Sequence, residues 1–295
     1  MMAQPNPTVR IWRSSPYRSF EEFFSKNGVG AQYFSLDPFR RTTIIGRCGT
    51  RFTFYPFSLV DHTGKLIEKE VEVKLTEVYS KKEMILTDKV TTSEDRLLES
   101  GGQFCIEAFY EGQPVHLNAP LTVEVPVRCK LRNALAMHLF QGSISKTRGF
   151  QAERGFDWTQ ASNKPLSIRK IGQRKFFYFQ ITDFNWWNCD FYFSKRCSKT
   201  MVSARHVCHH DDFDDMVAFL AFDHLNSVAR LYRGEHSFTS FNIPAKQSAT
   251  MLMMALRDGQ LYFGKRHISK TSNKLIYVKL EEVSEEETLE ELQLL

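Results

Sequence analysis

The densest set of potential metal ligands in this 295-residue chain is the stretch HVCHHDDFDD, residues 206–215. Imidazole nitrogens and thiolates are the ligands that zinc prefers, and a structural zinc site needs four of them, usually as two pairs. Cys208 with His210 has a suitable spacing, as has His206 with His210 if the segment is helical. A second pair would have to come from outside the stretch, where no spacing unites the nearby cysteines and histidines. We therefore expect no metal or cofactor here, with these three residues as the candidates if a metal does bind.

The aspartates of the same stretch also lack the pattern of a calcium loop. DDFDD has neither the alternate-position oxygens nor the glycine of an EF-hand. It runs into the solidly apolar segment DMVAFLAF, which is typical of a buried strand. We interpret residues 206–215 as a polar loop whose aspartates act as turn and cap residues. The three histidines leave open a mild pH sensitivity of this loop.

The second chemically rich stretch is NWWNCDFYF, residues 185–193. In an alternating strand Trp186, Asn188 and Asp190 share one face, while Trp187 and Cys189 share the other. This pattern favours a core tryptophan beside a row of polar hydrogen-bonding groups. An aromatic face next to polar edges also suits a base or a sugar. We predict that Trp186, Asn188 and Asp190 form the ligand or partner surface, if the chain has one in this region.

A short helix is predicted in the N-terminal arm, residues 1–41. SFEEFFSKNG has Ser19 and Glu22 at the spacing of a capping box and Gly28 as a stop. Phe20, Phe23 and Phe24 then share one face, which must dock either on the chain itself or on a partner. Docking on the chain itself is the favoured alternative.

The C-terminal residues 283–295 predict an acidic amphipathic helix. Ser284 and Glu287 again have capping-box spacing. Leu289 and Leu292 are its candidate docking residues, with the same two alternatives as the N-terminal helix.

Between these ends, strand patterns occur in two blocks. Residues 42–130 contain the alternating segments RFTFYPF, EVEVKLTEVY and QFCIEAFYEGQPVHL, with turns at DHTGKL and EGQP, which predicts an antiparallel β-sandwich. Residues 131–165 are expected to be a linker or bridging segment. Residues 166–282 are expected to be a second antiparallel β-rich domain, with a hairpin turn at RDGQ. The predicted fold class is mainly β, with two β-rich domains and short terminal helices.

Part of the first block resembles a known module. The matching positions are Gly46, Gly49-Thr50, Phe57, Gly64, Leu75 to Tyr79, Met84-Ile85, Thr92-Ser93, Leu97 to Glu99, Gly101-Gly102 and Ala108 to Gly112. They resemble a β-sandwich module found in proteins of Bacteroidota, which is distantly similar to the ZU5 domains of ankyrins and netrin receptors. NWWNCDFY is similar to the region that accompanies this module, except that Asn185 stands where relatives tend to have glycine. The resemblance implies an interaction scaffold rather than an enzyme, and relatives that are often exported.

Composition agrees with a folded protein of ordinary charge. The chain has 42% hydrophobic and 25% charged residues and a net charge of +5, with an acidic C-terminus and a more basic remainder. Arg40 and Arg41 form its densest basic run, so nucleic-acid binding is not expected. No secretion signal or membrane span is visible, and six scattered cysteines lack CxxC spacing, so we expect reduced thiols and a cytoplasmic location.

No spacing of a known catalytic motif is found in the sequence, which contains no GxSxG, P-loop, GxGxxG or HExxH pattern. We predict a non-enzymatic structural or protein-interaction component of a larger assembly, with a protein partner or homo-oligomerisation. The alternatives are a glycan- or nucleotide-type ligand-binding module that uses the Trp186 face, and a hydrolase whose site the sequence does not reveal.

Overall fold

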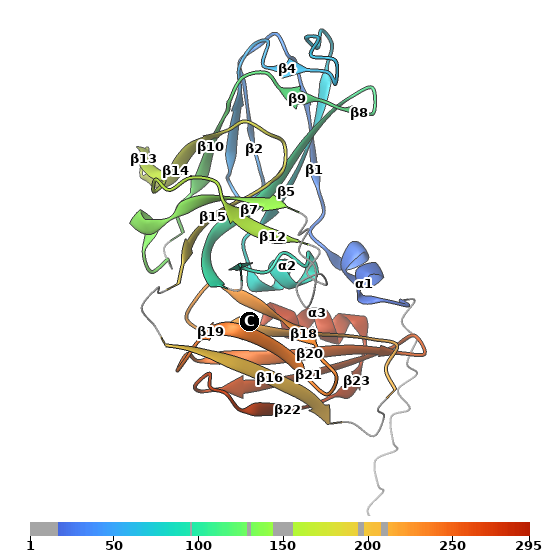
Figure 1. Cartoon of the computed structure of the whole chain (residues 1–295). Coiled ribbons are helices and arrows are strands. Elements are labelled where there is room, and N and C mark those ends of the chain that lie inside the picture. The colour runs from blue at the N-terminus through green and yellow to red at the C-terminus, as the bar shows by residue number, and fades with distance from the viewer. Residues whose placement is uncertain (1–16, 95, 129–130, 144–155, 194–197, 208–211) are drawn as a thin grey trace, which may run out of the picture.

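The computed structural model describes residues 17–94, 96–128, 131–143, 156–193, 198–207 and 212–295. Within these residues the chain is mainly β, as predicted, and its strands pair antiparallel, except that β16 and β22 of the expected second antiparallel domain pair in parallel. Figure 1 shows two β units, one above the other, with three α-helices in the layer between them. These are α1 (Phe20–Asn27), α2 (Lys81–Leu86) and α3 (Glu285–Gln293).

The upper unit is a β-sandwich whose two sheets share one core. The larger sheet has the order β1-β5-β7-β15-β11-β12, and the smaller sheet has the order β13-β14-β10-β3-β2. The bounds of the larger sheet are β1 Gln32–Leu36, β5 Val71–Val78, β7 Arg96–Tyr110, β15 Trp186–Tyr192, β11 His138–Ser143 and β12 Asp157–Gln160. Those of the smaller sheet are β13 Ser167–Ile171, β14 Arg174–Ile181, β10 Leu121–Pro126, β3 Arg51–Phe54 and β2 Thr42–Ile45.

Four short strands complete this unit. They are β4 (Leu59–Val60), which pairs with β9 (His116–Leu117), and β6 (Thr92–Ser93) and β8 (Gln113–Pro114), which both pair with β7. The predicted turn at EGQP joins β7 to β8, with Glu111 and Gly112 at φ values of 50° and 76°. Both central residues of such a hairpin turn need positive φ, which explains the glycine.

The sandwich extends further along the sequence than predicted. Residues 131–165, expected as a linker, contain β11 and β12, which belong to the larger sheet. The expected second domain also begins too early, because β13, β14 and β15 all lie in the sandwich. The pairing of Trp187 with Phe104 shows the reason, since strands far apart in the sequence are neighbours in the sheet. The change to the second unit therefore falls after β15 and not near residue 166.

The lower unit is one sheet of eight strands that nearly closes on itself. Its order is β22-β16-β19-β18-β17-β20-β21-β23. The bounds are β16 Lys199–Val207, β17 Asp215–Phe222, β18 Val228–Arg233, β19 Phe238–Pro244, β20 Ala249–Arg257, β21 Gln260–Ile268, β22 Leu275–Lys279 and β23 Glu281–Val283. The two ends of this order, β22 and β23, are adjacent in the sequence, so a single extended segment spans the gap between the two edges.

The segment from β22 into β23 passes close to Gly264 in β21. A Cβ atom there would lie 2.2 Å from the carbonyl oxygen of Lys279. Only glycine allows this close backbone approach. The hairpin between β20 and β21 turns at Asp258 and Gly259, with φ values of 48° and 72°, as predicted for RDGQ.

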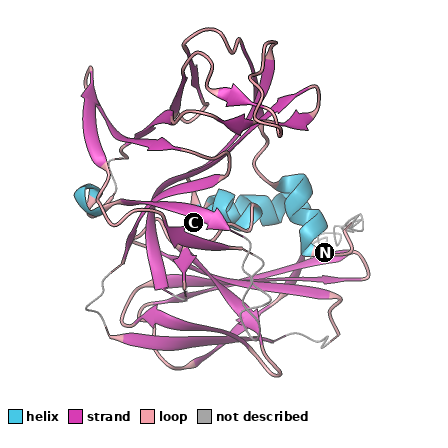
Figure 2. Cartoon of the chain, turned by 45° about the horizontal axis from the view of Figure 1, so that its top comes forward, coloured by secondary structure: helices cyan, strands magenta, loops and turns pink. Residues whose placement is uncertain are grey.

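Strands β17 and β20 are buried on both faces. One face contributes Ala218, Leu220 and other residues to the interior of the lower unit. The other face carries Val217, Phe219 and Leu252, which pack in the helical layer. A strand covered on both sides is expected to be continuously apolar rather than alternating, as in DMVAFLAF. Figure 2 shows this helical layer from a tilted view, with strands above and below it.

Helix α1 docks on the chain itself. Ser19 caps it by accepting a hydrogen bond from the Glu22 amide, but the Glu22 carboxylate accepts from the Arg18 amide, so only half of the predicted capping box forms. Gly28 follows its last turn, as predicted. Phe20, Phe23 and Phe24 are buried in the helical layer. The Phe20 amide also donates to Asp215 at 2.7 Å, which ties the helix to the start of β17. The three phenylalanines are therefore not free to bind a partner.

Helix α3 is also used within the chain. Ser284 and Glu287 form the predicted capping box. Leu292 is buried and Leu289 is partly buried in the helical layer, so these residues likewise dock in cis and not on a partner. In addition, Lys82 of α2 donates to the carbonyl oxygen of Leu289 at 2.9 Å.

Among the described residues, no helix is both long and apolar enough to cross a membrane.

Replacing Phe23 by alanine should strongly destabilise the protein. Its side chain is 0% exposed and lies in an edge-to-face contact with Tyr17, with ring centroids 5.2 Å apart. Removing a buried phenylalanine ring costs about 3–5 kcal/mol of unfolding free energy. Thermal and urea unfolding measure this effect. The control is Leu135→Ala, whose side chain is 76% exposed, and equal effects of the two substitutions would contradict the docking of α1.

Candidate functional site

The structure buries most of the predicted ligand surface. β15 does present Trp186 on the face opposite Trp187 and Cys189, which lie in the sandwich core as predicted. However, Asn188 and Asp190 are both 0% exposed. The prediction of an accessible row is therefore wrong, because the outer face of this sheet is covered. The alternative of core packing with a polar hydrogen-bonding row describes what is observed.

The polar row is a hydrogen-bonded group at the junction between the two units. The Ser100 hydroxyl donates to Asn188 Oδ1 at 2.9 Å, and Asn188 Nδ2 donates to Asp190 Oδ2 at 2.6 Å. From the lower unit, Asn226 Nδ2 donates to the carbonyl oxygens of Tyr79 and Ser100, at 3.1 and 2.9 Å. These contacts fix the loop before β18 against the end of the sandwich.

Two acidic side chains at this junction are incompletely hydrogen-bonded. Asp190 Oδ1 and Glu99 Oε2 are buried and have no hydrogen-bond partner within the described part of the chain. Burial raises the pKa of Asp190 well above its ordinary value, the neighbouring Ser100 hydroxyl opposes this, and the nearby Glu99 raises the pKa further. Burial likewise raises the pKa of Glu99. Groups so deeply enclosed affect stability and do not reach a substrate.

Trp186 itself packs between neighbouring side chains. Its ring lies 6.3 Å from that of Phe156, and Lys89 Nζ lies 5.6 Å from the Trp186 ring centroid and 4.4 Å from the Phe156 ring centroid. Burial lowers the pKa of Lys89. The partly buried Lys89 thus forms a cation–π contact with Trp186, so the Trp186 ring already has a partner within the chain.

The histidine-rich stretch is only partly described. Cys208 and His210 lie outside the described residues, and His206 in β16 packs edge-to-face on Phe213 with ring centroids 5.3 Å apart. Asp215 Oδ2 accepts from the Phe20 amide, and Asp214 Oδ2 accepts from the Asp258 amide at 2.8 Å. Asp215 thus caps helix α1 and Asp214 holds the turn between β20 and β21, as turn and cap residues do. The predicted loop is shorter than 206–215, because His206 lies in β16 and Asp215 in β17. Among described residues there is no group of three or more histidine, cysteine, aspartate or glutamate side chains that would hold a metal.

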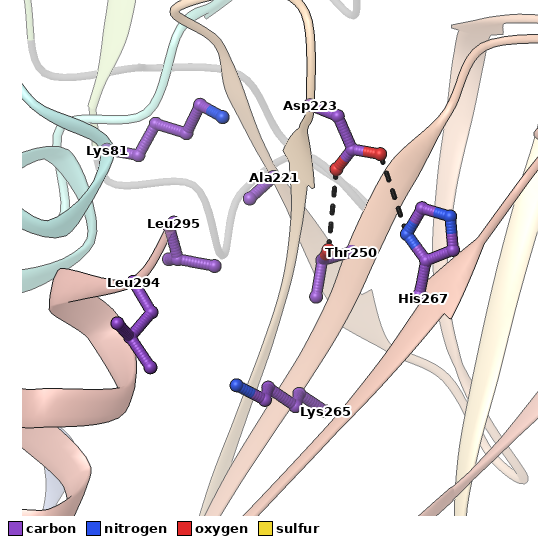
Figure 3. Close-up of a pocket in the computed structure, with 8 residues that line it drawn as sticks. All are labelled: Lys81, Ala221, Asp223, Thr250, Lys265, His267, Leu294 and Leu295. Atoms are coloured by element: carbon purple, nitrogen blue, oxygen red, sulfur yellow. Dashed lines mark hydrogen bonds and ion pairs between the residues drawn. The ribbon is translucent and has the colours of Figure 1, made fainter.

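A pocket of about 530 Å³ lies where β17, β20 and β21 meet α2 and α3 (Figure 3). Asp223 forms its polar wall, accepting from Thr250 at 3.4 Å and from Ser248, with His267 Nδ1 3.5 Å away. Ser248 donates to the aspartate and not to the histidine, so these residues are not the Ser-His-Asp arrangement of acyl transfer. Lys265 is paired with Glu291. Neighbours thus satisfy the charges of this pocket, and we assign it no ligand.

Three of the six exposed aromatic side chains among the described residues lie together at one edge of the sandwich, around β2 and the turn that follows β3. Phe39, Tyr55 and Phe57 are 46%, 37% and 52% exposed. The rings of Phe39 and Phe57 contact each other edge-to-face, with centroids 5.5 Å apart. The Arg41 guanidinium lies 5.6 Å from the centroid of Tyr55, and the Arg40 side chain is 82% exposed. We call these five residues the aromatic–arginine edge.

Phe57 is held in an unfavourable backbone conformation at this edge. The turn Tyr55 to Ser58 is closed by a 3.3 Å hydrogen bond between its ends, with Pro56 and Phe57 in the central positions. Phe57 has φ of 60°, in the left-handed region that favours glycine. Its amide donates to the carbonyl oxygen of Pro38 at 2.9 Å, which anchors the turn beside Phe39. A bulky residue in this region costs about 1–2 kcal/mol.

Sequence inspection did not reveal this edge. RFTFYPF has the alternation of a strand, which hides the turn at its end, and an aromatic residue is not the usual occupant of a glycine position. The signals that were available are Pro56 before Phe57 and the adjacent Arg40 and Arg41. None of them distinguishes an exposed phenylalanine from a core one.

Comparisons with known proteins give no identity. No family model matches the chain, and no curated protein matches it. Among solved structures it is similar to the Bacillus anthracis TIE protein, with 8% identity and a TM-score of 0.20. That match covers 88% of this chain and 42% of the TIE protein chain. At such a TM-score the similarity defines neither the fold nor the function.

Replacing Asp190 by asparagine should flatten the dependence of stability on pH. The raised pKa means that the folded state binds the Asp190 proton more tightly than the unfolded state, whose aspartates titrate near about pH 4. The stabilisation is complete below that pH and is lost as the pH rises toward the folded-state pKa. In that window each pH unit lowers the unfolding free energy by about 1.4 kcal/mol.

Urea unfolding at several values between about pH 4 and pH 8 tests this expectation. Asp258→Asn, in which a 90% exposed side chain loses its charge, is the matched control. If the unfolding free energy of Asp190→Asn changed with pH as steeply as that of the unmodified protein, the predicted role of Asp190 would be contradicted.

Proposed function

We propose that this chain is a non-enzymatic structural or interaction component of a larger assembly, and that it binds a protein partner through the aromatic–arginine edge. The observation that carries the proposal is Phe57, which is 52% exposed at a φ of 60°. Glycine would fit this turn without strain, so packing within the chain does not account for the phenylalanine. Strained residues with exposed side chains are typical of binding sites.

The chemistry of the edge suits a protein surface. Exposed aromatic rings give a large contact area at a small cost in side-chain entropy, and arginine adds planar donors for carboxylates. Arg41 lies over Tyr55, and Arg40 is paired with Asp37 at 3.2 Å in a largely exposed ion pair. Exposed pairs of this kind contribute little and are easily exchanged. A complementary partner therefore has an apolar surface flanked by acidic side chains.

We also propose that the sandwich is a ZU5-like module, which supports a scaffold role. Three glycines that carry the resemblance, Gly49, Gly64 and Gly102, have φ values of 91°, 84° and 137°. These are positions where the backbone conformation favours glycine.

Free thiols at Cys48, Cys105 and Cys189 support the expected reducing, cytoplasmic location.

A ligand-binding module on the Trp186 face is the less supported alternative. Asn188 and Asp190, which would supply its hydrogen bonds, are both 0% exposed. A glycan or nucleotide would have to separate the two β units to reach them.

The double variant Phe39→Ser with Phe57→Ser should weaken partner binding by at least about tenfold, since central aromatic residues supply most of the energy of an interface. A native pull-down from the cell of origin, followed by quantitative mass spectrometry, compares it with the unmodified chain. Leu135→Ser is the matched control because it also replaces an exposed apolar side chain. Equal recovery of every captured protein by the three baits would refute the proposal.

Phe57→Gly and Phe57→Ala should separate backbone strain from binding. Both variants remove the ring and should weaken partner binding equally. Because φ is 60° at this position, the glycine variant should be about 1 kcal/mol more stable than the alanine variant. Urea unfolding measures the difference, and equal stability of the two variants would show that the turn is not strained.

A further inference from the structure

The chain itself carries a surface that matches the partner described above. A groove of about 750 Å³ lies on the larger sheet, beside edge strand β1. Its lining includes Tyr33, Phe109, Glu70, Glu72 and Glu111. We call it the acidic groove. The acidic groove combines aromatic side chains with carboxylates. These are the groups that would complement the phenylalanines and arginines of the aromatic–arginine edge.

The acidic groove has unbalanced negative charge. Lys74 pairs with Glu107 at 2.9 Å and Lys69 pairs with Glu111 at 3.5 Å. Within the described part of the chain, Glu70 and Glu72 form no ion pair, and both are exposed. Tyr33 beside them is 61% exposed. Two carboxylates and an open aromatic ring are thus available to a docking surface.

The groove and the aromatic–arginine edge adjoin at one lateral edge of the sandwich. The groove lies on the outer face of the larger sheet, and the contact of Arg41 with Tyr55 lies on the outer face of the smaller one. Ser35 of β1 lines the groove, and the chain continues through Asp37 directly to Phe39 and Arg40. Strand β1 is at the end of the larger sheet and β2 is at the end of the smaller one, so both surfaces adjoin exposed sheet edges. The segment 37–41 joins β1 to β2 in the upper unit (Figure 1).

We propose that the partner is a second copy of this chain, with the aromatic–arginine edge of each copy docked in the acidic groove of the other. This inference rests on the proposed function and names its partner. A two-fold axis at the lateral edge where β1 and β2 lie would bring each basic surface onto the acidic groove of the other copy, which closes the assembly at two copies. The arginines then face Glu70 and Glu72, and the phenylalanines face Tyr33 and Phe109. Such complementarity sets orientation and excludes like-charged pairings.

Charge reversal tests the pairing in the full-length purified protein. Light scattering coupled to gel filtration should show a dimer for the unmodified chain. The variant Arg40→Glu with Arg41→Glu should be monomeric, as should Glu70→Lys with Glu72→Lys, because each places like charges in both contacts of the dimer. Glu235→Lys, a reversal at an 88% exposed site in the lower unit, should remain dimeric. Circular dichroism confirms that all variants are folded.

Mixing the two reversed variants provides the decisive measurement. One variant is then acidic on both surfaces and the other is basic on both, so a two-fold heterodimer has two favourable contacts again. The mixture should recover the dimer mass, while each variant alone stays monomeric. Failure of the mixture to dimerise would overturn the assigned pairing, and a continuous series of larger species would overturn the two-fold closure.

The outcomes distinguish this inference from the proposed function. If the purified unmodified chain is monomeric, but Phe39→Ser with Phe57→Ser still loses captured proteins in the pull-down, the edge binds a different protein and the second-copy inference is wrong. If the unmodified chain is dimeric and neither reversed variant changes its mass, the dimer uses another surface and the inference is again wrong. Loss of the dimer in both variants, with recovery on mixing, supports it.

Discussion

The arrangement of this chain depends on the apolar outer face of β17 and β20. The inner face of these strands fills the lower unit, so their outer face would be exposed if nothing covered it. Phe219, Val217 and Leu252 on that face are buried by helices from three distant parts of the sequence. Burying a side chain of this size contributes about 1.5–3 kcal/mol. The cover therefore holds the N-terminal arm, the sandwich helix α2 and the C-terminal helix against one sheet.

The junction between the units adds specificity to this apolar cover. Asn226 and Ser227 of the lower unit donate hydrogen bonds to the carbonyl oxygens of Ser100 and Leu98. Apolar surfaces tolerate sliding, whereas directed hydrogen bonds in a dry environment allow one register. Placing so many polar groups there also buries the carboxyl groups of Asp190 and Glu99. Burial disfavours their charged forms and so raises both pKa values. The junction is thus a structural device and not a catalytic site.

The sequence predicts local features well and long-range ones poorly. The caps at Ser19 and Ser284 and the turn at Asp258-Gly259 depend on a few neighbouring residues, and all three are observed. The continuous apolar pattern of β17 also predicts its burial correctly. The domain boundary failed because β15 pairs with β7 across about 80 intervening residues, which no local pattern encodes. For the same reason the alternation of Trp186, Asn188 and Asp190 identified their shared face but not what covers it.

The aromatic–arginine edge is likewise visible only in the structure. The sequence RFTFYPF has the pattern of an alternating strand with core phenylalanines. Only the φ of Phe57 shows that this residue lies in a turn and not in the strand. Almost every other phenylalanine that the structure describes contributes to a core or to the helical layer, where burial stabilises it. The rings of Phe39 and Phe57 contact each other and are 46% and 52% exposed, so the fold gains less from them than from a fully buried ring. A strained turn that presents such rings beside two arginines is therefore better explained by binding than by folding, and this difference is what separates the aromatic–arginine edge from the buried polar groups of the junction.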